Sequence, residues 1–167
     1  MKIECTIDKI PHTLYVNGSK PLNLILEYDV EAKSIMGECS GGLCGNCVVL
    51  LNEKAVLSCL IPAFLLQEAQ IMTFEGFQKT RFSQDVIRAY EDTGYYPCSH
   101  CFASKSLILE SILQQVEKTK EGLPEKLDDA TVVREMQLNR CSCLDAHEII
   151  DIYHAAAGYR RKRRARQ

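Results

Sequence analysis

The first 78 residues carry the short alternating patterns of a small mixed sheet. Residues 3–7 alternate apolar and polar side chains, as a half-buried strand does, and a second strand is expected over 13–16 after a turn near Lys9–Pro11. An apolar stretch after Pro21 predicts a short helix. Further strands are expected over 47–51, 55–58 and 71–74, with a turn at 52–54 and a break at Glu75-Gly76.

The second half follows a helical period instead. Apolar residues from Phe82 to Tyr90 share one helical face, and Gly94 and Pro97 are expected to end that helix. Four short helices with tight connections indicate a small bundle. The second helix is expected over 108–116, and a loop follows over 118–130. The third is expected to run from an N-cap at Thr131 through Leu138. The fourth is expected to begin at a capping box of Asp145 and Glu148 and to end near Gly158.

Length and composition fit these two units. The chain has 167 residues, of which 46% are hydrophobic and 25% charged, a soluble globular profile. We expect domains over 1–78 and 79–158, followed by a basic tail over 159–167. No apolar run reaches membrane-spanning length, and the start lacks the long apolar stretch of a signal peptide. The chain is therefore expected in the cytoplasm, without a membrane partner.

The net charge of −2 hides an asymmetry. Residues 160–167 contain six basic side chains, and 14 basic against 22 acidic residues remain without them. We expect a solvated, frayed tail. Docking onto an acidic partner subunit or contact with nucleic acid are the alternatives. Because no DNA-binding motif accompanies the tail, nucleic acid is not an expected partner.

Nine cysteines favour metal binding, because thiols stay reduced in the cytoplasm. Cys5 shares a strand face with Ile3 and Ile7 and is expected in the core. The other eight form two groups, which suggests two metal clusters. The first cysteine group is Cys39, Cys44, Cys47 and Cys59, and the second cysteine group is Cys98, Cys101, Cys141 and Cys143.

The first cysteine group has the spacing C-x4-C-x2-C followed by a distant cysteine, which is the spacing of plant-type [2Fe–2S] ferredoxins. Glycines permit close approach of the backbone to a cluster and let amides donate to sulfur. Zinc usually takes two short knuckles instead of one nine-residue loop, so [2Fe–2S] is the favoured interpretation. The glycines around the ligands are Gly37, Gly41, Gly42 and Gly45.

The second cysteine group is less specific. A C-x2-C pair and a C-x-C pair lie 39 residues apart, and such pairs also bind zinc, which stays an alternative here. The connections between helices can bring both pairs to one end of a bundle. His100 lies between two of the cysteines, but four thiols complete a site without it.

The stretch from Gly37 to Leu51, together with 57–60 and 73–76, resembles the iron–sulfur subunit of the xanthine dehydrogenase (molybdenum hydroxylase) family. The resemblance covers about residues 3–157. It implies a β-grasp, ferredoxin-like N-terminal domain and a C-terminal four-helix bundle, each with one [2Fe–2S] cluster. It also implies a molybdopterin-binding large subunit and an FAD-binding subunit as partners.

The surroundings of the second cysteine group depart from the family pattern. Where the family has Gln-Cys-Gly-x-Cys-Thr-Pro-Gly, this chain reads Pro-Cys-Ser-His-Cys-Phe-Ala-Ser over 97–104. The family's Cys-Arg-Cys-Thr-Gly-Tyr is Cys-Ser-Cys-Leu-Asp-Ala over 141–146. Pro97 lacks the side-chain donor of the family glutamine, which contacts the pterin.

These features predict an electron-transfer subunit of an oxidoreductase complex. Electrons would pass from the molybdopterin subunit through two [2Fe–2S] clusters to FAD, and no substrate site is expected in this chain. One alternative is a ferredoxin-like carrier for an oxidoreductase without molybdenum. Another is a cluster-based redox sensor that uses the basic tail, and a zinc-stabilised module is the last.

Overall fold

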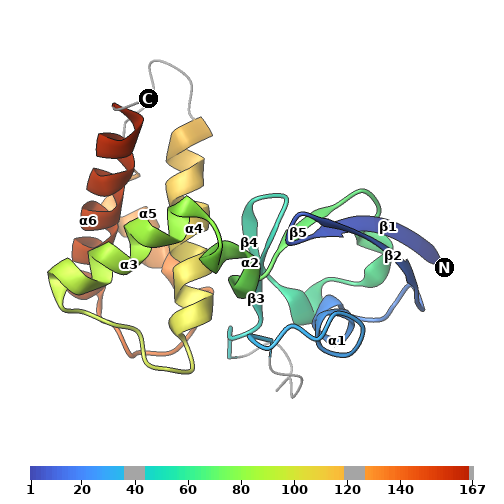
Figure 1. Ribbon diagram of the computed structural model, residues 1–167. Coiled ribbons are helices and arrows are strands. Elements are labelled where there is room, and N and C mark those ends of the chain that lie inside the picture. The colour runs from blue at the N-terminus through green and yellow to red at the C-terminus, as the bar shows by residue number, and fades with distance from the viewer. Residues whose placement is uncertain (36–43, 119–126, 166–167) are drawn as a thin grey trace.

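A mixed sheet lies beside a group of helices. The computed structural model describes residues 1–35, 44–118 and 127–165. Figure 1 shows the strands and helix α1 (Leu22–Tyr28) on one side, the long helices on the other, and helix α2 (Phe74–Gln78) between them. The predicted α+β class is confirmed.

The described strands form one sheet in the order β2-β1-β5-β3-β4. β1 and β5 are parallel, and the other neighbours are antiparallel. Both hairpins turn on two residues with positive φ, Asp8-Lys9 and Asn52-Glu53, a geometry that matches the twist of the strands. The strands are β1 (Lys2–Ile7), β2 (Ile10–Tyr15), β3 (Val48–Leu51), β4 (Lys54–Leu57) and β5 (Gln70–Met72).

The strand expected over 71–74 ends early, at Met72. Thr73 is the N-cap of α2 and accepts a hydrogen bond from the Gly76 amide at 3.4 Å. The Asp8 carboxylate fixes this corner, because it accepts hydrogen bonds from the Thr73 amide at 2.8 Å and the Thr73 hydroxyl at 2.6 Å. The predicted break at Glu75-Gly76 is therefore wrong, since both residues lie in α2.

Strand β3 is covered on both faces, which explains its unbroken apolar sequence. Successive side chains of a strand point to opposite faces. Val49 belongs to the core between the sheet and α1, where Cys5 is also buried as predicted. Val48 and Leu50 belong to the core that the sheet shares with the helices. The two parts predicted on either side of residue 78 therefore share one core.

Four helices follow α2 in the described part of the chain. Gly94 ends the first of them as a left-handed C-cap with φ 71°, and the capping box of Asp145 and Glu148 begins the last, both as predicted. Asp128, and not Thr131, caps the third, where its carboxylate accepts a hydrogen bond from the Thr131 amide at 2.9 Å. The helices are α3 (Arg81–Thr93), α4 (Phe102–Lys118), α5 (Asp129–Met136) and α6 (Ala146–Arg164).

Helix α6 continues past Gly158 to Arg164, so the expected frayed tail from residue 159 is wrong. Arg160 is only 3% exposed, because its guanidinium enters a buried acidic site between α3 and α4. It donates to Asp85 at 2.8 Å and to Glu110 at 2.5 Å. Arg163 pairs with Asp85 at 2.5 Å. Two of the six basic residues of this run therefore hold α6 against α3 and α4.

Replacing Arg160 with Met should destabilise the full chain by about 3–5 kcal/mol, because two buried carboxylates lose their shared partner. Urea denaturation followed by circular dichroism measures this loss. Lys162→Met on the exposed side of α6 is the matched control and should cost less than about 1 kcal/mol. Equal losses in the two variants would contradict the role given to Arg160.

Candidate metal centre

The four cysteines of the second cysteine group converge in the structure. Their sulfur atoms all lie within 4.8 Å of one another, although 39 residues separate the two pairs. Cys98 and Cys101 precede α4, and Cys141 and Cys143 lie in the connection between α5 and α6. The predicted convergence is confirmed. Cys101 is buried and Cys141 is exposed, so the site opens to the surface on one side.

Two helices begin close to these cysteines along the chain. Cys101 directly precedes the first residue of α4, and Cys143 lies three residues before α6. Helix N-termini carry partial positive charge and stabilise anions within their first turn. A turn closed by the Cys101 amide and the Cys98 carbonyl, 2.9 Å apart, places the first pair. Both cysteine pairs therefore lie next to the start of a helix.

The thiols of the group differ in acidity. A hydrogen bond with Cys101 lowers the pKa of Cys98, whereas burial raises the pKa of Cys101 to about 12. Burial also raises the pKa of Cys143, and the positive charge of Lys105 acts in the opposite direction. A bound metal would deprotonate all four thiols, since coordination outweighs such shifts.

The sulfur geometry suits a metal but does not select one. A tetrahedral ion with metal–sulfur distances of about 2.3 Å holds its sulfur ligands roughly 4 Å apart, within the separation found here. A two-iron cluster needs the sulfurs somewhat farther apart, which the exposed position of Cys141 permits. The positions of the sulfurs are therefore compatible with zinc and with an iron–sulfur cluster.

The first cysteine group is described in part. Cys39 and three of its glycines, Gly37, Gly41 and Gly42, lie outside the described residues. Cys47 and Cys59 flank the open end of the β3–β4 hairpin, where the Ser58 amide and hydroxyl donate to the Cys47 carbonyl at 3.0 and 2.7 Å. Cys44 precedes this end and is exposed. The sulfurs of the three described cysteines do not lie as close together as those of the second group.

Helix α2 anchors the chain just before residues 36–43. The Glu75 carboxylate accepts hydrogen bonds from the amide and the hydroxyl of Ser34, both at 2.6 Å. Burial raises the pKa of Glu75, but these hydrogen bonds outweigh burial and lower it overall. The stretch 73–76, one of those that resemble the family, therefore caps α2 and binds Ser34.

A polar junction joins the two cysteine groups. We define it as Cys44, Gly45 and Asn46 on one side and Asn139 and Arg140 on the other. The buried Asn139 side chain donates to the Gly45 carbonyl at 3.2 Å and to the Asn46 side chain at 2.7 Å. The Arg140 amide donates to the Cys44 carbonyl at 3.3 Å. The loop of the first group is thereby fixed against the loop of the second.

The polar junction also contacts the second cysteine group directly. Asn139 accepts a hydrogen bond from the Cys141 amide at 3.1 Å, and the Cys101 thiol lies 3.5 Å from the Asn46 side-chain oxygen. Sequence spacing did not identify Asn46 or Asn139, because both acquire their role from contacts across about 93 positions. The only sequence signal is that each lies within two residues of a candidate ligand.

At Gly45, the packing of the polar junction explains why the residue is a glycine. It has φ 81°, and a Cβ atom there would lie 2.3 Å from the Leu138 carbonyl oxygen and 2.5 Å from the Asn139 Cα. Close approach between the two loops therefore requires glycine. The structure places Gly45 against the second half of the chain, and its position beside a cluster stays a prediction.

No histidine of the described residues belongs to the cluster of ligand atoms that the second cysteine group forms. His100 is exposed in the turn between Cys98 and Cys101 and is not among the clustered ligand atoms. His147 and His154 approach Asp151 at 3.3 Å and Asp129 at 2.9 Å on the helices. His147 and His154 therefore contact carboxylates and are not among the clustered ligand atoms.

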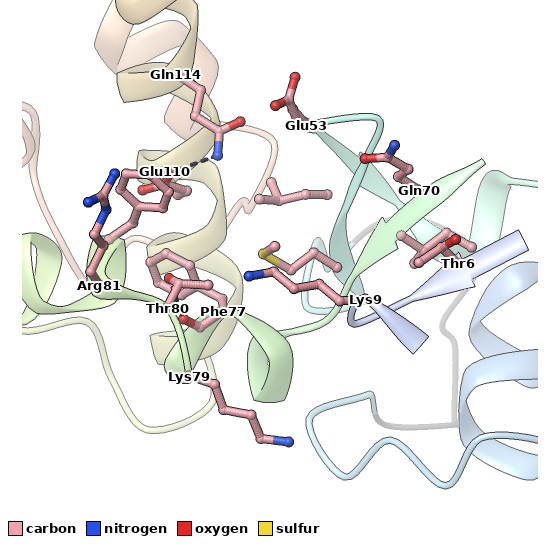
Figure 2. Close-up of a pocket in the computed structure, with 14 residues that line it drawn as sticks. Thr6, Lys9, Glu53, Gln70, Phe77, Lys79, Thr80, Arg81, Glu110 and Gln114 are labelled. Carbon is pink, nitrogen blue, oxygen red and sulfur yellow. Dashed lines mark hydrogen bonds between the residues drawn. The ribbon is translucent and has the colours of Figure 1, made fainter. Parts of the chain in front are cut away.

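A cleft of about 540 Å³ lies between the sheet and the helices, near the β3–β4 turn at the end away from Cys47. Figure 2 shows Lys9, Glu53 and Gln70 on its sheet side and Glu110 and Gln114 on its helix side. The Gln114 amide donates to the Glu110 carboxylate at 2.7 Å. Since Arg160 already pairs with Glu110, this carboxylate serves the fold.

Known proteins resemble this chain along most of its length. No family profile matches it. The xanthine dehydrogenase iron-sulfur-binding subunit of Escherichia coli O157:H7 is 28% identical over 149 residues, which cover 89% of each chain. In the structure of quinoline 2-oxidoreductase from Pseudomonas putida 86, a chain that is 27% identical matches with a TM-score of 0.73 and covers 97% of this chain and 96% of that one.

A larger protein shares the fold. The aldehyde oxidoreductase of Desulfovibrio desulfuricans matches with a TM-score of 0.76 and 22% identity, over 96% of this chain but only 17% of its own. The chain thus spans about a sixth of that enzyme. The resemblance to iron–sulfur subunits of the xanthine dehydrogenase and molybdenum hydroxylase family, predicted from the sequence, is confirmed. The Escherichia coli relative is named as a subunit of a dehydrogenase.

None of the described helices combines the length and apolar character needed to cross a membrane.

Replacing Gly45 with Ala should lower the free energy of unfolding by at least about 2 kcal/mol, because backbone strain adds to a clash with Leu138 and Asn139. Gly94→Ala is the matched control: its φ is 71°, but nothing lies within 4 Å of the added Cβ, so strain alone should cost about 1 kcal/mol. Urea denaturation of the full chain compares them. A Gly45 variant as stable as the Gly94 variant would argue against the tight junction.

Proposed function

We propose that the protein is the electron-transfer iron–sulfur subunit of a xanthine dehydrogenase-like oxidoreductase and holds two [2Fe–2S] clusters. The carrying observation is the convergence of four thiols within 4.8 Å in a chain that resembles iron-sulfur-binding subunits over 89% of its length. The second cysteine group would bind one cluster. The relatives favour iron and sulfide over zinc at this site.

The first cysteine group would bind the other cluster. Support comes from its ferredoxin-type spacing and from the position of Cys47 and Cys59 at one end of the β3–β4 hairpin. Cys39 and the neighbouring glycines would complete the loop. In the finer division, residues 1–78 form a β-grasp domain and residues 79–158 a four-helix bundle, one for each cluster. The sheet order and the four long helices are compatible with this division.

The chain's own contribution is to bind, space and tune the clusters. When bound, [2Fe–2S] clusters supply one-electron redox chemistry. The thiols bind them, the helix N-termini stabilise their negative charge, and the polar junction keeps the two sites at a fixed separation. Electrons would enter from a molybdopterin-binding subunit and leave to an FAD-binding subunit. Substrate chemistry would belong to the partner.

A second candidate is an electron carrier that serves an oxidoreductase without molybdenum. Pro97 favours it, because it replaces the family glutamine that contacts the pterin, and residues 98–104 also depart from the family pattern. Purification of the tagged chain from its native cell separates the candidates. A molybdopterin-containing subunit in the complex supports the first function, and a redox partner that lacks molybdenum supports the second.

Iron content tests the proposed function. The purified full chain should contain about four iron and four sulfide and show the visible spectrum of oxidised [2Fe–2S] centres. Cys141→Ala should lower the iron content to about two per chain, because one site loses a ligand. Cys5→Ala is the matched control, since Cys5 is buried in the core of the sheet, and should keep about four. Colourless protein that contains zinc would overturn the proposal.

A further inference from the structure

Lys105 is a buried cation beside the second cysteine group. Its side chain belongs to the first turn of α4 and the residue is 1% exposed. Its backbone amide donates to the Cys101 carbonyl at 2.8 Å, one helical turn earlier. Its ammonium donates to the Asn139 carbonyl at 3.4 Å, two residues before Cys141. The lysine is therefore fixed to the neighbours of both cysteine pairs.

The buried Lys105 ammonium has no carboxylate partner in the parts of the chain that the structure describes. An ammonium has three donors, and here one acceptor is recorded. Burial of an unpaired charge is strongly unfavourable. Arg160 illustrates the usual solution, because two carboxylates surround its buried guanidinium. Lys105 therefore needs a negative charge from another source.

The thiols of the second cysteine group can supply that charge. Lys105 and Cys141 line the same cavity of about 240 Å³. The positive charge of Lys105 also reaches Cys143, where it favours the thiolate. Four thiolates around two irons and two sulfides carry a net negative charge in both redox states. A cluster at this site would therefore supply the negative charge that no described carboxylate supplies to Lys105.

We propose that Lys105 is the counter-charge of the second cluster and raises its reduction potential, an inference that rests on the proposed function. Reduction adds one electron, converts one iron from ferric to ferrous and adds one negative charge, while no bond to the cluster breaks. A fixed positive charge therefore favours the reduced state more than the oxidised state. The electron comes from a reduced cofactor of the partner subunit, or from dithionite in the test.

The test is a redox titration of the full chain with dithionite, followed by electron paramagnetic resonance. Lys105→Met keeps the length and apolar stem of the side chain but removes its charge. It should lower the equilibrium constant for reduction of one cluster at least about tenfold, which is about 59 mV for a one-electron couple. Lys105→Arg keeps the charge and should leave the potential near that of the unaltered chain. The exposed Lys54→Met is the control and should shift neither cluster.

Repeating the titration in a second variant shows which cluster's reduction potential depends on Lys105. In Cys141→Ala, where only the first cluster should remain, Lys105→Met should have no effect. If the unaltered chain forms no iron–sulfur cluster, the proposed function fails. If both clusters form and Lys105→Met leaves both potentials unchanged, the inference about Lys105 is overturned while the function stands. Loss of the second cluster in Lys105→Met with retention in Lys105→Arg would support the need for charge, and loss in both would overturn it.

Discussion

The hydrogen bonds of Asn139 are the interaction on which the candidate site depends. This buried side chain contacts the loop of the first cysteine group through Gly45 and Asn46, and the second group through the Cys141 amide. It also donates to the Ser104 hydroxyl at 2.7 Å, which in turn donates to the Cys101 carbonyl at 3.0 Å. One residue thus fixes the relative position of two loops that the chain order keeps far apart.

The shared core makes that junction rigid. Because β3 buries both of its faces, the sheet cannot move against the helices without exposing Val48 and Leu50. The buried ion pairs of Arg160 hold α6 against α3 and α4, the helices on either side of the first cysteine pair of the second group. Electron transfer between two sites depends steeply on their separation, so rigidity of this kind serves the proposed function directly.

Local sequence patterns predicted most of the helices and strands but not the contacts between them. The alternation of residues 3–7 identified β1, Gly94 identified the end of α3, and Asp145 with Glu148 identified the start of α6. Cysteine spacing identified four thiols that do converge. The signals for these features lie within a few residues, where backbone preference and capping chemistry act. Local patterns placed some boundaries only approximately. The N-caps Thr73 and Asp128 begin their helices a few residues from the predicted boundaries.

The rest could not be predicted because it arises from long-range contacts. The basic run at 160–166 has the composition of a solvated tail, and only the folded chain brings Asp85 and Glu110 to Arg160. Lys105 likewise has no sequence signal beyond its place four residues after Cys101. In both cases a charged side chain is buried: Arg160 pairs with carboxylates from distant parts of the chain, and Lys105 donates to the Asn139 carbonyl, 34 residues away. Buried charges are therefore the features that the sequence concealed most completely.

We propose that the two cysteine groups hold two clusters at a short, fixed separation. Electron paramagnetic resonance of the fully reduced full chain at low temperature tests this proposal, since two paramagnetic centres a short distance apart split or broaden each other's signals. We expect two [2Fe–2S] signals with mutual magnetic interaction, which disappears when the chain is reduced by only one electron. Two independent signals without interaction, or a single cluster signal, would contradict it.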